Sequence, residues 1–405
     1  MSPTFIPTKK GKLATYSVGS GQPVIFLHGG PGDTHHYMRR MAEPLTSKFQ
    51  CIFFDQRGTG QSEILDRTPD DFTLDLLFED LISVKNYYKA DTASLVGHSW
   101  GAMYALFASL KFPSVFPRSA LLNMGPLDDE IGAATSQSLL DTLSPSEKEN
   151  WTSLRKIRNA AREEGRLEDV LAADKEMMRL RVKSWVFSSD LREIFLQEYF
   201  QDPPPDREVN KWIWESIQGW FSWEMLPSAK SDFWVCVGRN DSVPVEQANR
   251  LVRLAPHSCM TVFENCGHIP WLEHPERFYD ELTAFLNHSK AVIRKVLEDY
   301  EVAYPNPIRL SVGDKVQVTK RETNPDWLGW VFCIDKHGVS GWVSEKYLNI
   351  DGPSAEVLRN YDASELAVKA GENVYCLVEE FGWAWVRNAQ NLEGWIPIKN
   401  LGGLE

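Results

Sequence analysis

Three polar residues, far apart in the chain, have the types and the order needed for acyl transfer through a serine. Ser99 stands in the pentapeptide GHSWG at residues 97–101, and Asp241 and His268 follow it in the sequence. A G-x-S-x-G segment holds its serine on a sharp turn between a strand and a helix. In such a trio the histidine takes the serine proton, while the acid orients the imidazole and stabilises its charged form. We predict Ser99, Asp241 and His268 as nucleophile, acid and base.

The same chemistry needs backbone donors for the negative charge that develops on the carbonyl oxygen of the substrate. A second glycine-rich segment, HGGPG at residues 28–32, follows the apolar run VIFL. We assign one donor to the N–H of Gly30 and the other to the N–H of Trp100, the residue after the serine. Glycine-rich turns also bind phosphate, but this one lacks the GxGxxG and GxxxxGK[ST] spacings of nucleotide sites.

Alternating strand and helix patterns surround these residues. The apolar runs PVIFL, CIFF and ASLVG in the first part of the chain, and FWVCVG and MTVF in the later part, predict buried strands. Strands that alternate with helices indicate an α/β fold, a mostly parallel sheet with helices on both faces. Ser99, Asp241 and His268 each follow such a run, so we expect all three at the carboxyl edge of one sheet.

The character of the sequence changes between residues 126 and 227, where long, charged helical segments contain no strand-like run. We expect this segment to form a helical cap. It would be inserted between the two halves of the α/β core, residues 1–125 and 228–290. The aromatic residues of the cap recur at roughly helical spacing, and we expect most of them to pack the cap itself.

Beyond residue 290 short alternating segments are separated by Gly, Asn and Asp turns, which predicts an all-β region. This region contains an internal repeat. VLEDYEV, LSVGDKVQV and GWVSEKYL are followed in the same order by VLRNYDA, LAVKAGENVYCLV and GWIPIKNL. We predict two small barrels of one type, at residues 291–351 and 352–405.

The composition favours a soluble cytoplasmic protein. A net charge of −13 disfavours a nucleic-acid partner. No segment is apolar enough to span a bilayer, and the amino terminus lacks the apolar core of a secretion signal. The six cysteines are scattered without CxxC pairs, which predicts free thiols rather than zinc sites or disulfides. His35 and His36 lie near Asp33 but lack the spaced partners of a metal site. We expect neither a metal nor an organic cofactor.

Five motifs together resemble the proline iminopeptidase group of α/β-hydrolases. They are HGGPG, FFDQRGTGQS, GHSWGA, GRND and CGH, in this order, within residues 20–125 and 230–287. The resemblance implies the α/β-hydrolase fold and a serine hydrolase that acts on a small peptide, amide or ester and releases an N-terminal proline. It places the family's catalytic triad and its two oxyanion donors on the five residues assigned above.

In that group, acidic residues of the cap bind the free amine of the substrate. The cap segment WIWESIQGWFSWEM contains Glu215 and Glu224, which we predict in this role. The nucleophile segment reads GHSWGA where the peptidases commonly have GGSWGS, and this is nearer to esterases and lactonases. An esterase or lactonase without aminopeptidase activity is therefore the first alternative.

The C-terminal repeats resemble Src-homology-3-like barrels. The first copy matches at Tyr300 and Trp327, and the second at Tyr361, Trp383 and GWIP, residues 394–397. In that family an aromatic groove binds proline-rich segments. We expect the barrels to pack on the hydrolase or to mediate contact with a protein partner or self-assembly. The second alternative for the whole chain is an inactive binding or scaffold protein that acts through its barrels.

Overall fold

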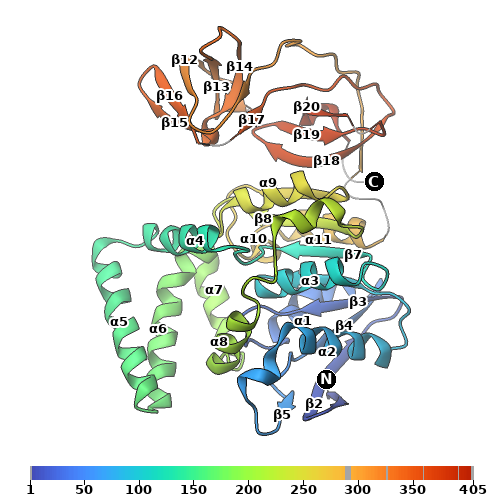
Figure 1. Cartoon of the computed structure of the whole chain (residues 1–405), viewed down its shortest axis with the longest axis vertical. Coiled ribbons are helices and arrows are strands. Elements are labelled where there is room, and N and C mark those ends of the chain that lie inside the picture. The colour runs from blue at the N-terminus through green and yellow to red at the C-terminus, as the bar shows by residue number, and fades with distance from the viewer. Residues whose placement is uncertain (1, 288–292, 325–326, 359, 391, 403–405) are drawn as a thin grey trace. The chain divides into compact units, whose positions relative to one another are not determined.

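The computed structural model describes residues 2–287, 293–324, 327–358, 360–390 and 392–402 (Figure 1). The chain divides into two compact units. The first contains residues 1–258 and 263–287, and the second contains residues 259–262 and 288–405. No helix among the described residues has the length and apolarity needed to cross a membrane.

A nine-stranded sheet forms the centre of the N-terminal region. The strand order is β1-β2-β4-β3-β6-β7-β8-β9, and β5 pairs with β2. Pairing is antiparallel at β1-β2-β4 and parallel from β4 through β3, β6 and β7 to β8. The bounds from β1 to β9 are Thr4–Thr8, Gly11–Val18, Gln22–Leu27, Phe49–Phe54, Glu63–Ile64, Ser94–His98, Arg118–Leu122, Asp232–Gly238 and Ser258–Phe263.

The central strands are buried along almost their whole length. Every residue of β6 and β7 is buried, and only the first residue of β8 is partly exposed. Strands that are apolar on both faces are typical of a parallel sheet covered by helices, so this sheet has the predicted α/β architecture. The helices of the core are α1 (His36–Ala42), α2 (Leu74–Tyr87), α3 (Trp100–Lys111), α9 (Val245–Leu254), α10 (Pro270–Glu273) and α11 (Pro275–Leu286).

The segment between β7 and β8 is helical, as the sequence predicts. It consists of α4 (Asp129–Asp141), α5 (Pro145–Glu163), α6 (Leu167–Trp185), α7 (Ser189–Tyr199), α8 (Arg207–Ser216) and the 3-10 helix η3 (Trp223–Ser228). Helix α5 begins at a capping box, in which Ser144 and Glu147 bind each other's backbone N–H. Residues of α6 and α7 form an apolar cluster with Ile269, so the cap packs on the segment that follows His268.

The second unit contains two main sheets. One has the order β14-β13-β12-β16-β15 and the other β10-β18-β19-β20, while β11 and β17 form a separate pair. The bounds from β10 to β20 are Ile293–Lys295, Arg309–Leu310, Lys315–Arg321, Trp330–Ile334, Ser340–Ser344, Leu348–Asp351, Ser354–Val357, Tyr361–Asp362, Asn373–Glu380, Trp383–Arg387 and Glu393–Pro397. This all-β region confirms the predicted class of the C-terminal part.

Strand pairing in this unit crosses the boundary predicted between residues 351 and 352. Strand β10, from the opening of the first repeat, pairs with β18 of the second repeat. Strand β16, from the opening of the second repeat, pairs with β12 and β15 of the first. Each barrel therefore contains the opening segment of the other repeat. The two openings are similar in sequence, so either one fits the same place in a barrel.

Candidate active site

Ser99 lies where β6 ends and α3 begins, with φ 55° and ψ −118°. A positive φ is strained for a residue other than glycine, and it persists only where the surroundings enforce it. Glycines at both flanks allow the tight turn. A Cβ on Gly97 would collide with the backbone of Gly101, and a Cβ on Gly101 would collide with the carbonyl of Leu27. The backbone N–H of Ser99 donates to the carbonyl of Leu122 at 3.0 Å, which fixes the turn to β7.

His268 and Asp241 form a buried pair. Nδ1 of His268 lies 2.7 Å from Oδ2 of Asp241, and the two side chains are 3% and 2% exposed. A carboxylate accepts hydrogen bonds, so Nδ1 carries the hydrogen and Nε2 is left to take a proton. Asn123, at the end of β7, donates through Nδ2 to the same carboxylate oxygen at 2.8 Å and to the carbonyl of Gly267 at 3.0 Å. The Asn123 side chain thus holds Asp241 against the loop that follows β9 and carries His268, which we call the histidine loop.

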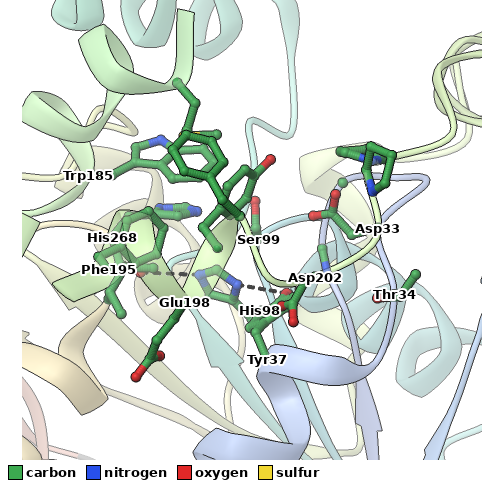
Figure 2. Close-up of a pocket in the computed structure, with 18 of the residues that line it drawn as sticks. Asp33, Thr34, Tyr37, His98, Ser99, Trp185, Phe195, Glu198, Asp202 and His268 are labelled. Atoms are coloured by element: carbon green, nitrogen blue, oxygen red, sulfur yellow. Dashed lines mark hydrogen bonds between the residues drawn. The ribbon is translucent and has the colours of Figure 1, made fainter. Parts of the chain in front are cut away.

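Ser99 and His268 line the same cavity (Figure 2). In the described part of the chain no hydrogen bond joins the Ser99 hydroxyl to the imidazole. Hydrogen bonds between a nucleophile and its base are often long without substrate and shorten in the complex. The arrangement is therefore compatible with proton transfer from Ser99 to His268 once a substrate is bound.

Two backbone N–H groups next to Ser99 have no hydrogen-bond acceptor among the described residues, those of Gly30 and Trp100. Trp100 opens α3, and the first N–H groups of a helix have no partner within it. Gly30 belongs to the loop after β3, which approaches the serine closely. A Cβ on Gly29 would lie 3.3 Å from Cβ of Ser99. Both N–H groups are available to a substrate oxygen.

A chain of hydrogen bonds runs from this loop to the histidine through the residue before the nucleophile. The N–H of Gly29 donates to the Tyr37 hydroxyl at 2.6 Å, and that hydroxyl lies 3.0 Å from Nδ1 of His98. Nε2 of His98 lies 3.1 Å from the carbonyl of His268 and must donate to it. Burial, with the nearby His268 as a second cause, holds the pKa of His98 well below its usual range. His98 is therefore neutral, and both its nitrogens have partners.

Gln56 supports the loop from the end of β4. Its N–H donates to Nε2 of His28 at 3.0 Å, and its side-chain amide donates to the carbonyl of His28 at 2.8 Å. Its side-chain oxygen accepts from the indole N–H of Trp100 at 2.9 Å. Burial lowers the pKa of His28 to about 4, so this imidazole is a neutral structural group. The sequence analysis did not single out Gln56. Its position in FFDQRG, just after a buried strand, is the signal that could have identified it.

The cap contacts the histidine through the end of α6. The indole of Trp185 stacks on the imidazole of His268 at 5.0 Å, and the Trp185 carbonyl accepts from the N–H of His268 at 2.6 Å. A Cβ on Gly267 would collide with that carbonyl. Glu273 accepts from the N–H of Gly267 at 2.7 Å and from the N–H of Ser188 at 2.9 Å. The cap and the histidine loop are thus directly hydrogen-bonded to each other.

The cavity has a volume of about 670 Å³, which is within the usual range for small-molecule sites. Aromatic residues form much of its wall, and Trp185, Phe195 and Tyr37 are among those that Figure 2 labels. Its charged residues are Asp33, Asp174, Glu198, Asp202, Arg40, Lys175, Arg181 and Arg207. Such a site suits a small substrate with both apolar and charged groups.

Several of these charges are paired. Arg40 donates to both oxygens of Asp202 at 2.8 and 2.9 Å, and Arg207 donates to Asp174 at 3.0 Å. Asp33, in contrast, has no hydrogen bond or ion pair within the described ranges of the chain. Burial raises the pKa of its carboxyl to about 6.

The predicted cap carboxylates lie outside the cavity. Glu215 is exposed and lies 3.7 Å from Lys211 on the same helix, and Glu224 is exposed and accepts from the Ser222 hydroxyl at 2.7 Å. Consecutive residues of a helix point about 100° apart, so Trp214 lines the cavity while its neighbour Glu215 faces solvent. The structure therefore does not bring either glutamate to Ser99.

Across the described residues, no group of His, Cys, Asp and Glu side chains is arranged to hold a metal ion. The imidazole of His35 is bound instead to Asp55, with 2.8 Å between Nδ1 and Oδ1. All six cysteines are buried and none is in a disulfide.

The chain matches the Alpha/beta hydrolase family over residues 24–281 and the Variant SH3 domain over residues 294–351. It is 26% identical over 312 residues to a proline iminopeptidase of Clostridioides difficile, across 70% of this chain and 97% of that protein. A proline iminopeptidase of Saccharolobus solfataricus is 24% identical over 278 residues, across 66% and 86% of the two chains. The crystal structure of a Mycobacterium smegmatis proline iminopeptidase is similar with a TM-score of 0.53 at 22% identity, covering 71% of this chain and 99% of that one.

Proposed function

The chain belongs to the Alpha/beta hydrolase family, and from this membership we propose that it is a serine hydrolase that cleaves a small amide or ester through an acyl-enzyme. The observation that carries the proposal is the buried His268–Asp241 pair, 2.7 Å apart, in contact with the cavity that Ser99 lines. An imidazole whose Nδ1 is bound to a carboxylate, in the cavity that a serine on a strained turn also lines, is the arrangement that activates a hydroxyl.

In the proposed reaction, Nε2 of His268 takes the hydroxyl proton as Oγ of Ser99 bonds to the carbonyl carbon. The carbonyl oxygen becomes negative and accepts from the N–H groups of Gly30 and Trp100. The imidazolium, stabilised by Asp241, then gives its proton to the leaving amine or alcohol as the bond to carbon breaks. Water, deprotonated by the same imidazole, attacks the ester and releases the acid and Ser99.

We further propose that the substrate presents a free amine, as in the release of an N-terminal proline. In this proposal Asp33 takes the role that the family resemblance implied for Glu215 and Glu224. A Cβ on Gly30 would lie 3.3 Å from Cγ of Asp33, so this carboxyl lies next to the proposed oxyanion donor. The α-amine of a peptide is attached to the carbon beside the scissile carbonyl. A carboxylate at this place can therefore bind it. The names of the relatives support the same reading.

Replacement of the nucleophile tests the mechanism. We expect Ser99→Ala to lower kcat by at least about 10³-fold and to abolish labelling by a fluorophosphonate probe. Ser136→Ala, at an exposed position on α4, is the matched control and should be labelled like the unmodified chain. Full activity in folded Ser99→Ala would overturn the assignment. A folded wild-type chain that takes up no label would favour the scaffold alternative.

Proline 4-nitroanilide and 4-nitrophenyl acetate separate the two enzyme classes. Cleavage of both is expected of an aminopeptidase with this triad, since esters are the more reactive acyl donors. Cleavage of the ester alone would support the esterase or lactonase alternative. Asp33→Asn should reduce turnover of the proline amide far more than turnover of the ester.

A further inference from the structure

The residue before the nucleophile is joined to the two loops that complete the active site. Ser99 follows β6, the proposed oxyanion donor Gly30 is in the loop after β3, and His268 is in the histidine loop. His98 is the last residue of β6 and is 5% exposed. Its two ring nitrogens lie 3.0 Å from the Tyr37 hydroxyl and 3.1 Å from the carbonyl of His268 (Figure 2).

The partners in this chain of bonds determine where each hydrogen atom lies. His98 is neutral, and a carbonyl oxygen only accepts, so Nε2 of His98 carries the ring hydrogen and Nδ1 has none. Nδ1 must therefore accept the hydrogen of the Tyr37 hydroxyl, whose oxygen accepts from the N–H of Gly29 at 2.6 Å. Tyr37 lines the cavity, but its single hydroxyl hydrogen is used within the protein. Tyr37 thus supports the loop and does not donate a proton to the substrate.

Aromatic packing holds both side chains in this arrangement. The indole of Trp271, on α10, lies 4.8 Å from the His98 ring at 88° and 6.4 Å from the Tyr37 ring at 18°. Edge-to-face and offset-stacked contacts are the favoured arrangements of aromatic rings. A Cβ on Gly29 would lie 3.0 Å from the Tyr37 hydroxyl and 3.3 Å from Cβ of Ser99, so the loop is packed closely against both. Neither ring can turn away without losing these contacts.

The chain of bonds ends at the groups that act on the substrate. Gly29 directly precedes Gly30, so its bond to Tyr37 fixes the segment from which the proposed oxyanion donor points. At the other end, the backbone of His268 is bound on both sides. Its N–H donates to a carbonyl of the cap at 2.6 Å, and its carbonyl accepts from His98. A displacement of about 1 Å at such a group can lower the rate about 100-fold.

We propose that Tyr37 and His98 are positioning residues. They hold the N–H of Gly30 and the imidazole of His268 at fixed places relative to the nucleophile. The inference rests on the proposed function, because it assigns a task only in a reaction that uses Ser99. Neither side chain donates a hydrogen bond to the substrate, so their loss lowers turnover and leaves binding almost unchanged. The two side chains act through one chain of bonds, so their effects are not independent.

Turnover of 4-nitrophenyl acetate tests the inference with a substrate that has no amine. We expect Tyr37→Phe to lower kcat about tenfold and His98→Leu to lower it about 100-fold, each with little change in KM. His98→Gln should recover about tenfold of the loss in His98→Leu. Its amide nitrogen is as many bonds from Cβ as Nε2 of histidine and can donate to the His268 carbonyl. Tyr87→Phe and His257→Gln, at exposed positions, are the matched controls and should keep the wild-type kcat.

The double variant decides whether the two residues act together. Independent effects multiply, which predicts a loss of about 1,000-fold for Tyr37→Phe with His98→Leu. A single chain of bonds predicts about the same 100-fold loss as His98→Leu alone. Unchanged kcat in either single variant, no recovery in His98→Gln, or multiplied losses would each overturn the inference. If His98→Leu does not fold, the kcat and KM of Tyr37→Phe against Tyr87→Phe still decide.

Failure of the proposed function gives a different pattern. A chain without serine chemistry is not labelled by the fluorophosphonate and does not turn over 4-nitrophenyl acetate. A serine hydrolase that does not depend on Tyr37 and His98 is labelled, turns over the ester and keeps its kcat in Tyr37→Phe.

Discussion

At the scale of single residues, Asp33 changes charge close to neutral pH, because burial raises the pKa of its carboxyl to about 6. In the proposed role, the carboxylate binds a substrate ammonium above that pH, and the protonated acid does not bind it below. The α-amine stays charged across this range. We therefore expect kcat/KM for proline 4-nitroanilide to fall more steeply below pH 6 than kcat/KM for 4-nitrophenyl acetate, approaching an extra tenfold per pH unit. Both profiles are measured on the same chain.

The neutral ester reports the ionisation of the catalytic groups alone, so it is the internal control for this experiment. Asp33→Asn should make the two profiles parallel. Asp190→Asn, at an exposed position on α7, should leave them different. Parallel profiles in the unmodified chain would show that Asp33 does not hold the amine.

Residues that follow buried strands were predictable, and residues of the cavity wall were not. Asp241 and His268 follow β8 and β9, and the structure brings them within 2.7 Å. A parallel sheet aligns its strand ends, so order along the chain translates into proximity. Their catalytic roles, and that of Ser99, stay predictions. Arg181 shows the opposite case. The position of its side chain next to Trp185 and the cavity depends on how α6 packs, and no local sequence pattern predicts this packing.

At the scale of elements, the junction between the cap and the histidine loop depends on Glu273. Its carboxylate accepts from Gly267 and Ser188, which belong to the loop and the cap. Glutamine has one acceptor oxygen, so Glu273→Gln leaves one of these N–H groups unpaired. We expect kcat to fall about tenfold with a smaller change in KM, and stability to fall by about 1–3 kcal/mol. Steady-state kinetics and thermal unfolding measure the two effects.

Glu276→Gln is the matched control, since Glu276 is exposed at the start of α11. It should leave kcat unchanged. An unaltered kcat in Glu273→Gln, with or without lower stability, would mean that the cap does not position His268.

The helical content of the cap was predictable, but the direction of its side chains was not. Charged helical segments without strand-like runs indicated helices, and α4 to α8 occupy that segment. The amphipathic pattern of α8 shows that one face is buried, yet it does not show whether that face meets the sheet, the cap or the cavity. Glu215 was predicted from the family resemblance and lies on the solvent side, while Trp214 lines the cavity.

At the scale of the whole molecule, the repeat was visible in the sequence and the exchange of strands was not. VLEDYEV and VLRNYDA are alike, so a pattern cannot tell which barrel each one joins. In the structure Tyr300 lies against Trp383 of the second repeat, at 6.0 Å between rings. Tyr361 lies against Tyr347 of the first repeat, at 5.1 Å. The two repeats therefore form one folding unit, because each contributes a strand to the other.

A shortened chain tests whether the two repeats exchange their opening strands or form two separate barrels, one after the other. A chain that ends at residue 351 keeps the whole first barrel as the sequence predicted it, but it lacks β16. Ala355 and Val357 of β16 are buried, and the strand pairs with both β12 and β15. Without it, two strands gain open edges and the apolar interior is exposed. We expect amide hydrogen exchange in β12 and β15 to rise towards unfolded rates. A chain that ends at residue 402 keeps every described strand and should retain its protection from hydrogen exchange. Protection of β12 and β15 in the chain that ends at residue 351 would contradict the exchange of opening strands between the repeats.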